Sequence, residues 1–264
     1  MPQSDIAGKE HWDGLYKAKD STPPDWRPRS YDEMVIGHAL VSEIERLKSR
    51  TLLEVGCGDS VWLPYLARET GASVAGVDYS EAGCELTRRR MKAHGVEGQV
   101  WCADLFGTTP DEIGQHDFVF SLGLVEHFSD LEGVLSALLK FVRPGGTLFT
   151  EVPNLRSAHG MMMWVWQPAL LAKHELIGKG QLKRAYERLG LKGVRGGYLG
   201  AFSLSVVGWD IYARWPKFAE RAAPWVFRFN GSLDPYLQRR KWYGGTAPLA
   251  PYLYAVGQKP DAKQ

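Results

Sequence analysis

Residues 52–62, with the sequence LLEVGCGDSVW, constrain the fold more than any other stretch of this chain. The apolar run at 51–55 predicts a buried strand, and Gly56 and Gly58 follow it directly. Residues 61–69 then show a helical pattern, with Pro64 tolerated in the first turn and Gly71 just beyond the end. A strand, a glycine turn and a helix in this order predict the first unit of an α/β fold, with a binding loop between strand and helix.

The same alternation continues along the chain and predicts the architecture. Further strands are expected at 73–77, 99–102, 116–121, 147–152, 192–199 and 252–256, and helices at 31–47, 80–92, 131–142 and 179–189. Such alternation implies a Rossmann-like doubly wound α/β sheet of about seven strands, mostly parallel, with helices on both faces. The aromatic stretch at about 202–243 is too long for a plain connection, so it predicts a helical insertion between the last two strands.

These elements suggest a division of the chain into three parts. Residues 1–50 form an N-terminal helical lead-in that could act as a lid, and residues 51–153 form the ligand-binding core. Residues 154–264 contribute substrate-side helices, the inserted cap and the final strands of the same domain. A length of 264 residues is compatible with one large α/β domain.

Composition limits the classes of partner. The net charge of +2 gives no electrostatic case for nucleic acid. Three widely spaced cysteines argue against a disulfide framework and favour a reducing compartment. The N-terminus does not resemble a signal peptide, and the apolar stretch 161–172 is too short to span a bilayer. We therefore expect a cytoplasmic protein without a transmembrane segment, and the oligomeric state stays open.

The first loop and the end of the second strand suggest a nucleoside ligand. Gly56 and Gly58 allow the backbone to turn sharply and to approach a ligand without Cβ interference. Asp78 ends the second strand, 22 positions after Gly56, a spacing that suits an acidic side chain accepting hydrogen bonds from ribose hydroxyls. On this evidence a nicotinamide dinucleotide and S-adenosylmethionine fit equally well.

Two local details distinguish these ligands. Val61 stands where a dinucleotide loop carries its third glycine, and residues 56–63 contain no basic side chain for a pyrophosphate. Glu54 places negative charge near the ligand, which suits an amino group or a sulfonium rather than a phosphate. Both details favour S-adenosylmethionine.

Over about residues 51–153 the chain resembles the class I S-adenosylmethionine-dependent methyltransferases, because several of their motifs occur in order. These motifs are Glu54-Val55-Gly56-Cys57-Gly58, Val77-Asp78-Tyr79-Ser80, Ala103-Asp104-Leu105-Phe106, residues 118–127 and Arg143-Pro144-Gly145-Gly146-Thr147. The departure is Asp59-Ser60, since many members carry a third glycine at position 60; short Asp and Ser side chains can cap the following helix instead.

The resemblance implies roles for individual residues. Asp78 would hold the ribose, Tyr79 would lie against the adenine, and Asp104 would accept a hydrogen bond from the adenine amino group. The remaining cofactor-binding residues would be Glu54, Gly56, Cys57, Gly58, Leu105 and Leu122. Cys57 has no cysteine or histidine at ligand spacing, so it is interpreted as a small apolar filler and no metal is expected.

Methyl transfer is an in-line displacement that depends mainly on alignment, and only an acceptor with a proton to lose needs a base. His127, after the fourth strand, is the first candidate for a base or positioning residue. Packing or hydrogen bonding within the Glu126-His127 turn is an equally open role. Glu126, His159 and His174 are second-rank candidates.

Aromatic and apolar residues flank the core and could contact an acceptor: Trp12, Tyr16, Trp26, Met161, Trp164 and Trp166. They could equally form the core of the cap. The sequence thus predicts a methyltransferase acting on a small-molecule acceptor, with a sugar, polysaccharide or lipid-linked acceptor as the alternative. A non-catalytic S-adenosylmethionine-binding protein is a further alternative.

Overall fold

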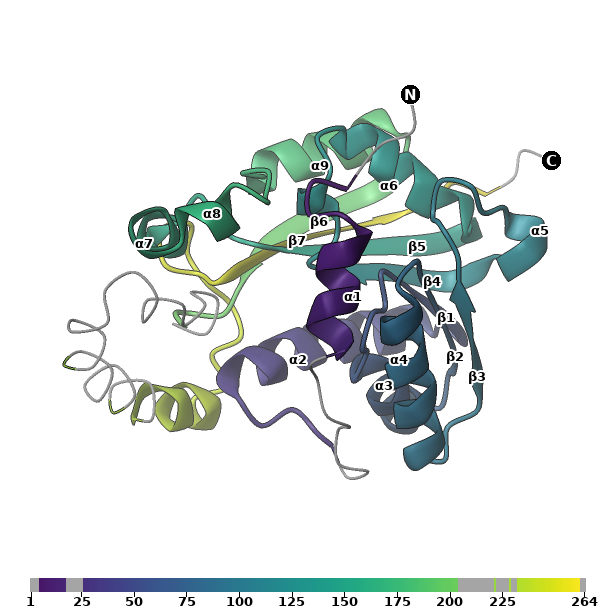
Figure 1. Ribbon diagram of the computed structural model, residues 1–264, viewed down its shortest axis with the longest axis horizontal. Helices are drawn as coiled ribbons and strands as arrows, with labels where there is room; N and C mark the ends of the chain where they lie inside the picture. The colour runs from purple at the N-terminus through teal and green to yellow at the C-terminus, as the bar shows by residue number, and fades with distance from the viewer. Residues whose placement is uncertain (1–4, 18–25, 204–220, 222–227, 229–231, 262–264) are drawn as a thin grey trace.

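The computed structural model describes residues 5–17, 26–203, 221, 228 and 232–261 and has a seven-stranded sheet at its centre (Figure 1). The strands are β1 (Thr51–Val55), β2 (Ser73–Asp78), β3 (Gly98–Cys102), β4 (His116–Leu122), β5 (Val142–Pro153), β6 (Lys192–Leu199) and β7 (Tyr252–Gln258). Their order across the sheet is β3-β2-β1-β4-β5-β7-β6. β1 to β5 pair in parallel, and β7 runs antiparallel to both β5 and β6. The predicted mostly parallel sheet is confirmed.

Helices cover both faces of this sheet (Figure 1). They are α1 (Lys9–Lys17), α2 (Tyr31–Leu47), α3 (Trp62–Thr70), α4 (Glu81–Ala93), α5 (Pro110–Ile113), α6 (Leu131–Lys140), α7 (Ala158–Trp166), α8 (Pro168–Leu171) and α9 (Lys179–Arg188), with a short 3-10 helix, η1 (Val125–His127). One core lies between the sheet and α6 and α9, and a second between the sheet and α2, α3 and α4. The two apolar layers explain why the inner strands are buried on both sides.

Local signals set the ends of the helices near the loops. Ser30 and Glu33 form a capping box at the start of α2, and the Ser80 hydroxyl accepts a hydrogen bond from the Gly83 amide at the start of α4. The Ser60 hydroxyl accepts from the amides of Trp62 and Leu63, each at 3.1 Å. The expectation that the Asp59-Ser60 pair caps the next helix is thereby confirmed for Ser60.

Two expectations about the later chain need comment. The expected strand at 147–152 begins earlier, at Val142, because Val142 already pairs with His116 of β4, and a register shift separates this pair from Phe118 and Thr147. The expected cap at 202–243 falls largely outside the described residues; of its described part, residues 232–239 are helical. Leu237 in that helix packs against Tyr31 and Val35 of α2. Within the described part of the chain, no helix is long and apolar enough to cross a membrane.

Candidate functional site

A cavity of about 140 Å³ opens where β1, β2 and β3 end. Its walls are formed by Asp5, Val55, Gly56, Val77, Asp78, Tyr79, Ala103, Asp104, Leu105, Phe106, Leu124 and Phe128. β1 lies between β2 and β4, so the chain order reverses at this point of the sheet. The cavity therefore occupies the switch point at which open α/β sheets bind their ligands.

Asp78 is the fixed acidic group of this cavity. It is only 7% exposed, and its two oxygens accept hydrogen bonds from the amides of Gly58 at 2.8 Å and Ser80 at 2.7 Å. Burial raises the pKa of Asp78, and the two amides oppose that rise because they stabilise the ionised form. Since each carboxylate oxygen carries two lone pairs, Asp78 holds the glycine loop and retains acceptor capacity toward a ligand.

The glycines of the loop adopt conformations that other residues avoid. Gly56 has φ +73° and Gly58 has φ +43°. A Cβ at Gly56 would lie 2.8 Å from the Leu124 side chain, and one at Gly58 would lie 2.2 Å from the Tyr16 hydroxyl. Both positions need glycine for the turn and for the close packing above it.

The structure brings only some of the predicted cofactor residues to the cavity wall. Those on the wall are Gly56, Asp78, Tyr79, Asp104 and Leu105. Glu54, Cys57, Gly58 and Leu122 are not among the described residues that line it. β4 ends at Leu122, and Gly123 then turns the chain with φ +60°, so Leu124 takes the wall position instead.

Several wall residues were missed by the sequence interpretation. Phe106 and Phe128 form an edge-to-face pair with ring centroids 5.5 Å apart; Phe106 is the last residue of the motif at 103–106, and Phe128 directly follows the motif at 118–127. These positions were a signal that could have identified both. Asp5 had no such signal, because it reaches the cavity only through the tertiary placement of the N-terminal segment.

Glu54 lies beneath the loop. It is 3% exposed and accepts a hydrogen bond of 2.5 Å from the Ser60 hydroxyl, which in turn caps α3. Burial, together with the negative charges of Asp59 and Asp78, raises the pKa of Glu54 from 4.5 to about 8, and the hydrogen bond from Ser60 opposes this rise. Its contact with a ligand amino group stays a prediction, and its observed contact supports the shape of the loop.

We expect Glu54→Gln to stabilise the unliganded protein at pH 8.5 but not near pH 5. The folded protein binds a proton at Glu54 between pH 4.5 and about 8, whereas the unfolded chain does not. The free energy of unfolding of the wild type therefore falls as pH rises through this window, by up to several kcal/mol. Glutamine carries no such penalty and can still accept from Ser60. Urea unfolding of both proteins at the two pH values measures the difference, and equal slopes against pH would contradict the expectation.

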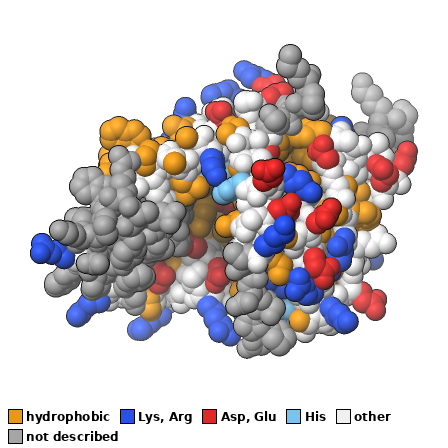
Figure 2. All heavy atoms as spheres, viewed as in Figure 1, with side chains coloured by type: hydrophobic (Ala, Val, Ile, Leu, Met, Phe, Trp, Pro, Cys, Tyr) orange, Lys and Arg blue, Asp and Glu red, His pale blue; other side chains and the backbone are white. Residues whose placement is uncertain are grey.

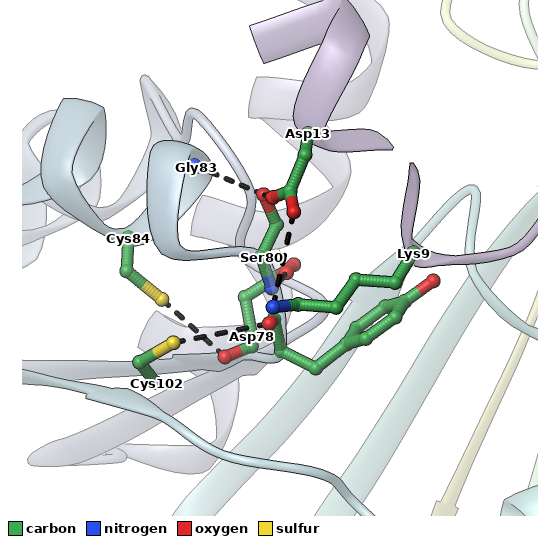
Figure 3. A network of polar contacts seen from close by, with 8 residues as sticks. Lys9, Asp13, Asp78, Ser80, Gly83, Cys84 and Cys102 are labelled. Carbon is green, nitrogen blue, oxygen red and sulfur yellow. Dashed lines mark hydrogen bonds and ion pairs between the residues drawn. The ribbon is translucent and has the colours of Figure 1, made fainter. Parts of the chain in front are cut away.

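The N-terminal helix α1 lies beside α4 and in front of the sheet (Figure 1). Tyr16 packs on the backbone of Gly58 and Gly83, and the Ser80 hydroxyl donates to Asp13 at 2.5 Å (Figure 3). The Tyr79 hydroxyl donates to Asp5. None of the residues of α1 is buried. Polar contacts and the ring of Tyr16 thus hold α1 against the glycine loop, and its action as a lid stays a prediction.

The three cysteines lie closer together than their spacing indicated. The thiols of Cys84 and Cys102 donate to the carbonyl oxygens of Asp78 at 3.3 Å and Tyr79 at 3.8 Å (Figure 3). Cys57 is 4% exposed, and its sulfur packs over Gly76. This position matches the interpretation of Cys57 as a small buried filler.

The predicted acceptor residues separate into two groups. Trp12 stacks on Tyr16, with ring centroids 6.1 Å apart, and meets the His127 ring edge-on at 5.0 Å. These two residues of α1 are close to the cavity. Trp26 is not, because it packs edge-on against Trp62 and Tyr65. Met161 and Trp164 are largely exposed on α7, and Trp166 packs in a small cluster beside Leu155 and Met163.

His127 lies in η1, next to wall residues Leu124 and Phe128. Its Nδ1 is 2.9 Å from the Lys173 carbonyl oxygen, and its ring centroid is 4.6 Å from that of His174. Burial, together with nearby His174, lowers the pKa of His127 to about 4. The imidazole is therefore neutral at physiological pH but a weak base by itself.

Comparison with known proteins agrees with this geometry. The sequence profile of a family described as "Methyltransferase domain" matches residues 31–195. The chain belongs to the methyltransferase-domain family. The expected resemblance to class I S-adenosylmethionine-dependent methyltransferases is thereby confirmed.

Two curated relatives of this methyltransferase-family chain are named O-methyltransferases. The chain is 30% identical to a ubiquinone biosynthesis O-methyltransferase of Bordetella avium over 108 residues, which cover 41% of this chain and 44% of the relative. Identity to the Aeromonas salmonicida enzyme of that name is 30% over 137 residues, or 51% and 55% of the two chains. The chain therefore spans about half the length of these relatives.

Two solved structures share the fold. One is a plantazolicin methyltransferase in complex with SAH, with a TM-score of 0.58 at 14% identity, covering 96% of this chain and 90% of the other. The other is a SAM-dependent methyltransferase from Archaeoglobus fulgidus, with a TM-score of 0.52 at 18% identity, covering 84% and 94%.

Proposed function

We propose that this protein transfers a methyl group from S-adenosylmethionine to an oxygen of a small-molecule acceptor. The observation that carries the proposal is the placement of Asp78 at the carboxyl end of β2, bonded to the glycine loop and facing the cavity. Family membership and the O-methyltransferase names of the relatives support the reaction type and the oxygen acceptor.

The cavity wall suits this cofactor better than a dinucleotide. The wall carries Asp5, Asp78 and Asp104, whereas none of the described residues that line it is a lysine, arginine or histidine. A pyrophosphate would meet only acidic groups there, while a sulfonium and an amino group are attracted by them. The aromatic and aliphatic side chains of the wall offer a flat apolar surface for an adenine ring.

Each part of the chain has a task in this reaction. When bound, S-adenosylmethionine supplies a methyl group on a positively charged sulfur, a good leaving group. Asp78 would hold the ribose, and Asp104, whose Oδ1 accepts from the Phe106 amide at 3.0 Å, would face the adenine. α1, with Trp12 and Tyr16, would exclude water and align the acceptor.

Exposed apolar side chains favour a second class of acceptor, one with a hydrocarbon chain or lipid link. Met161, Trp164 and Val165 of α7 are 66%, 68% and 40% exposed, and hydrophobic side chains gather over this end of the molecule (Figure 2). Such a patch can receive an apolar tail while the reactive group enters the cavity. Trp164→Ala should then raise KM for long-chain acceptors and leave KM for chain-free analogues unchanged.

The proposal is tested by following transfer of labelled methyl groups from S-adenosylmethionine to a panel of phenols, hydroxy acids, lipid-linked phenols and sugars. We expect product with at least one hydroxyl-bearing small molecule. Titrations with S-adenosylhomocysteine and with NADH run in parallel. Binding of S-adenosylhomocysteine without any methylated product would favour a non-catalytic binding protein, and binding of NADH alone would overturn the cofactor assignment.

We expect deletion of residues 1–17 to lower turnover at least about tenfold, since water would reach the reacting groups and alignment would be lost. Stability should fall by only about 1–3 kcal/mol, because no residue of α1 is fully buried and the segment contributes a few part-buried hydrogen bonds and the packing of Tyr16 and Trp12. The cut stops before Trp26, which packs on α3, and before Ser30, which caps α2. Turnover and urea unfolding are compared in the two proteins. Unchanged turnover would contradict the hypothesis that α1 acts as a lid.

A further inference from the structure

Three potential metal ligands converge beside the cofactor cavity. Glu126 and His127 belong to η1, directly after β4, and His174 follows α8. One ligand atom from each lies within 4.8 Å of the other two. The proposed reaction so far gives none of these three side chains a role.

Backbone contacts orient the imidazoles of His127 and His174 and fix which ring nitrogen can bind a metal. Nδ1 of His127 is 2.9 Å from the Lys173 carbonyl oxygen, and Nδ1 of His174 is 2.8 Å from the Leu170 carbonyl oxygen. A carbonyl oxygen can only accept, so each Nδ1 carries the proton and each Nε2 keeps a free lone pair. Metal-bound histidines are oriented in this way, with the second nitrogen donating to a carbonyl or carboxylate.

Buried carboxylate oxygens at this place lack a partner within the described part of the chain. Glu126 is 2% exposed, and its Oε2 has no hydrogen-bond partner among the described residues. Glu151 is 3% exposed, and its Oε1 is equally unpartnered within the described ranges. The Lys173 ammonium lies 3.0 Å from His11 Nδ1. A buried carboxylate oxygen without a hydrogen-bond partner is costly, and a bound cation beside Glu126 would offset that cost.

We infer that Glu126, His127 and His174 bind one divalent cation of the zinc class. Two imidazole nitrogens and one carboxylate oxygen are a donor set typical of zinc and other late first-row metals, whereas magnesium prefers oxygen ligands throughout. Three protein ligands leave a position open for another oxygen. The sequence expectation of no metal considered only the surroundings of Cys57, and nothing in the sequence joins His174 to a motif 47 positions earlier.

The open position suggests a use, which rests on the proposed function. The site adjoins wall residues Leu124 and Phe128 and lies under Trp12. Figure 2 shows a hollow lined with hydrophobic side chains on this face of the molecule, a path by which an acceptor could enter. An acceptor hydroxyl bound there would lose its proton to water more readily. Its oxygen would then attack the methyl carbon while the carbon–sulfur bond breaks, giving a methyl ether and S-adenosylhomocysteine.

The site is tested first without cofactor or acceptor. Full-length protein is treated with a chelator, freed of it, and titrated with Co²⁺, whose visible absorption reports nitrogen and oxygen coordination. We expect one equivalent to bind to the wild type and to the control His38→Ala, and binding to be lost in Glu126→Gln and His174→Ala. Glu126→Gln preserves size and guards against misfolding. Absence of stoichiometric binding to the wild type, or equal binding to both site variants, would overturn the inference.

A second measurement tests the role of the cation. Chelation should lower methyl transfer at least about tenfold, with recovery on adding Zn²⁺, and should leave the affinity for S-adenosylhomocysteine unchanged. Unchanged transfer after chelation would overturn the activating role. Failure of S-adenosylhomocysteine to bind would instead sink the proposed function, and the cobalt titration would still decide the metal site.

Discussion

Asp78→Ala is expected to lower the affinity for S-adenosylhomocysteine by about 100-fold or more. Hydrogen bonds to a charged acceptor contribute about 1.5–3 kcal/mol each, and two ribose hydroxyls would meet this carboxylate. The substitution also removes the acceptor for the Gly58 and Ser80 amides, so the loop that shapes the cavity loses its anchor. Calorimetric titration of the two proteins measures the change.

Two companions make this result interpretable. Asp78→Asn keeps one acceptor oxygen but loses the charge, and should fall between the wild type and the alanine variant. Asp111→Asn alters an exposed aspartate in the first turn of α5, away from the cavity, and should bind as the wild type does. Thermal unfolding checks that each protein is folded. A folded Asp78→Ala protein that binds within threefold of the wild type would contradict the assigned role.

Phe118→Ala is expected to lower the free energy of unfolding by about 3–5 kcal/mol, the range for truncating a fully buried phenylalanine. Phe118 is 0% exposed in the middle of β4, and its ring centroid lies 6.0 Å from those of Phe120 and Phe149. The cavity left behind would lie between rigid strands of the central sheet, which cannot collapse to fill it. Because a domain of this kind is stable by only about 5–15 kcal/mol, the loss is a large share of the total.

Guanidinium unfolding followed by tryptophan fluorescence measures this loss. The matched control is Trp164→Ala, which removes an aromatic ring that is 68% exposed and should change stability by less than about 0.5 kcal/mol. Similar effects of the two substitutions would mean that the sheet core around β4 is not packed as described.

The agreement between sequence and structure is best where local patterns carry the information. The strand, glycine turn and helix around Gly56 are encoded by neighbouring residues, so the loop, the cap at Ser60 and the position of Asp78 were predictable. Parallel pairing of β1 to β5 follows from the alternation of strands with helices. Glu54 shows the limit, because a residue beside a glycine loop can point under it as easily as into it.

What the sequence by itself determined is therefore the fold class, the binding loop and its acidic partner, all of which depend on periodicity and spacing within a few residues. The tertiary structure decided which distant segments meet there. In the folded chain Tyr16 packs on Gly58, Trp26 packs on α3 rather than at the cavity, and His174 lies beside Glu126 and His127. These contacts join residues far apart in the chain, and their energies arise only when packing places the elements together.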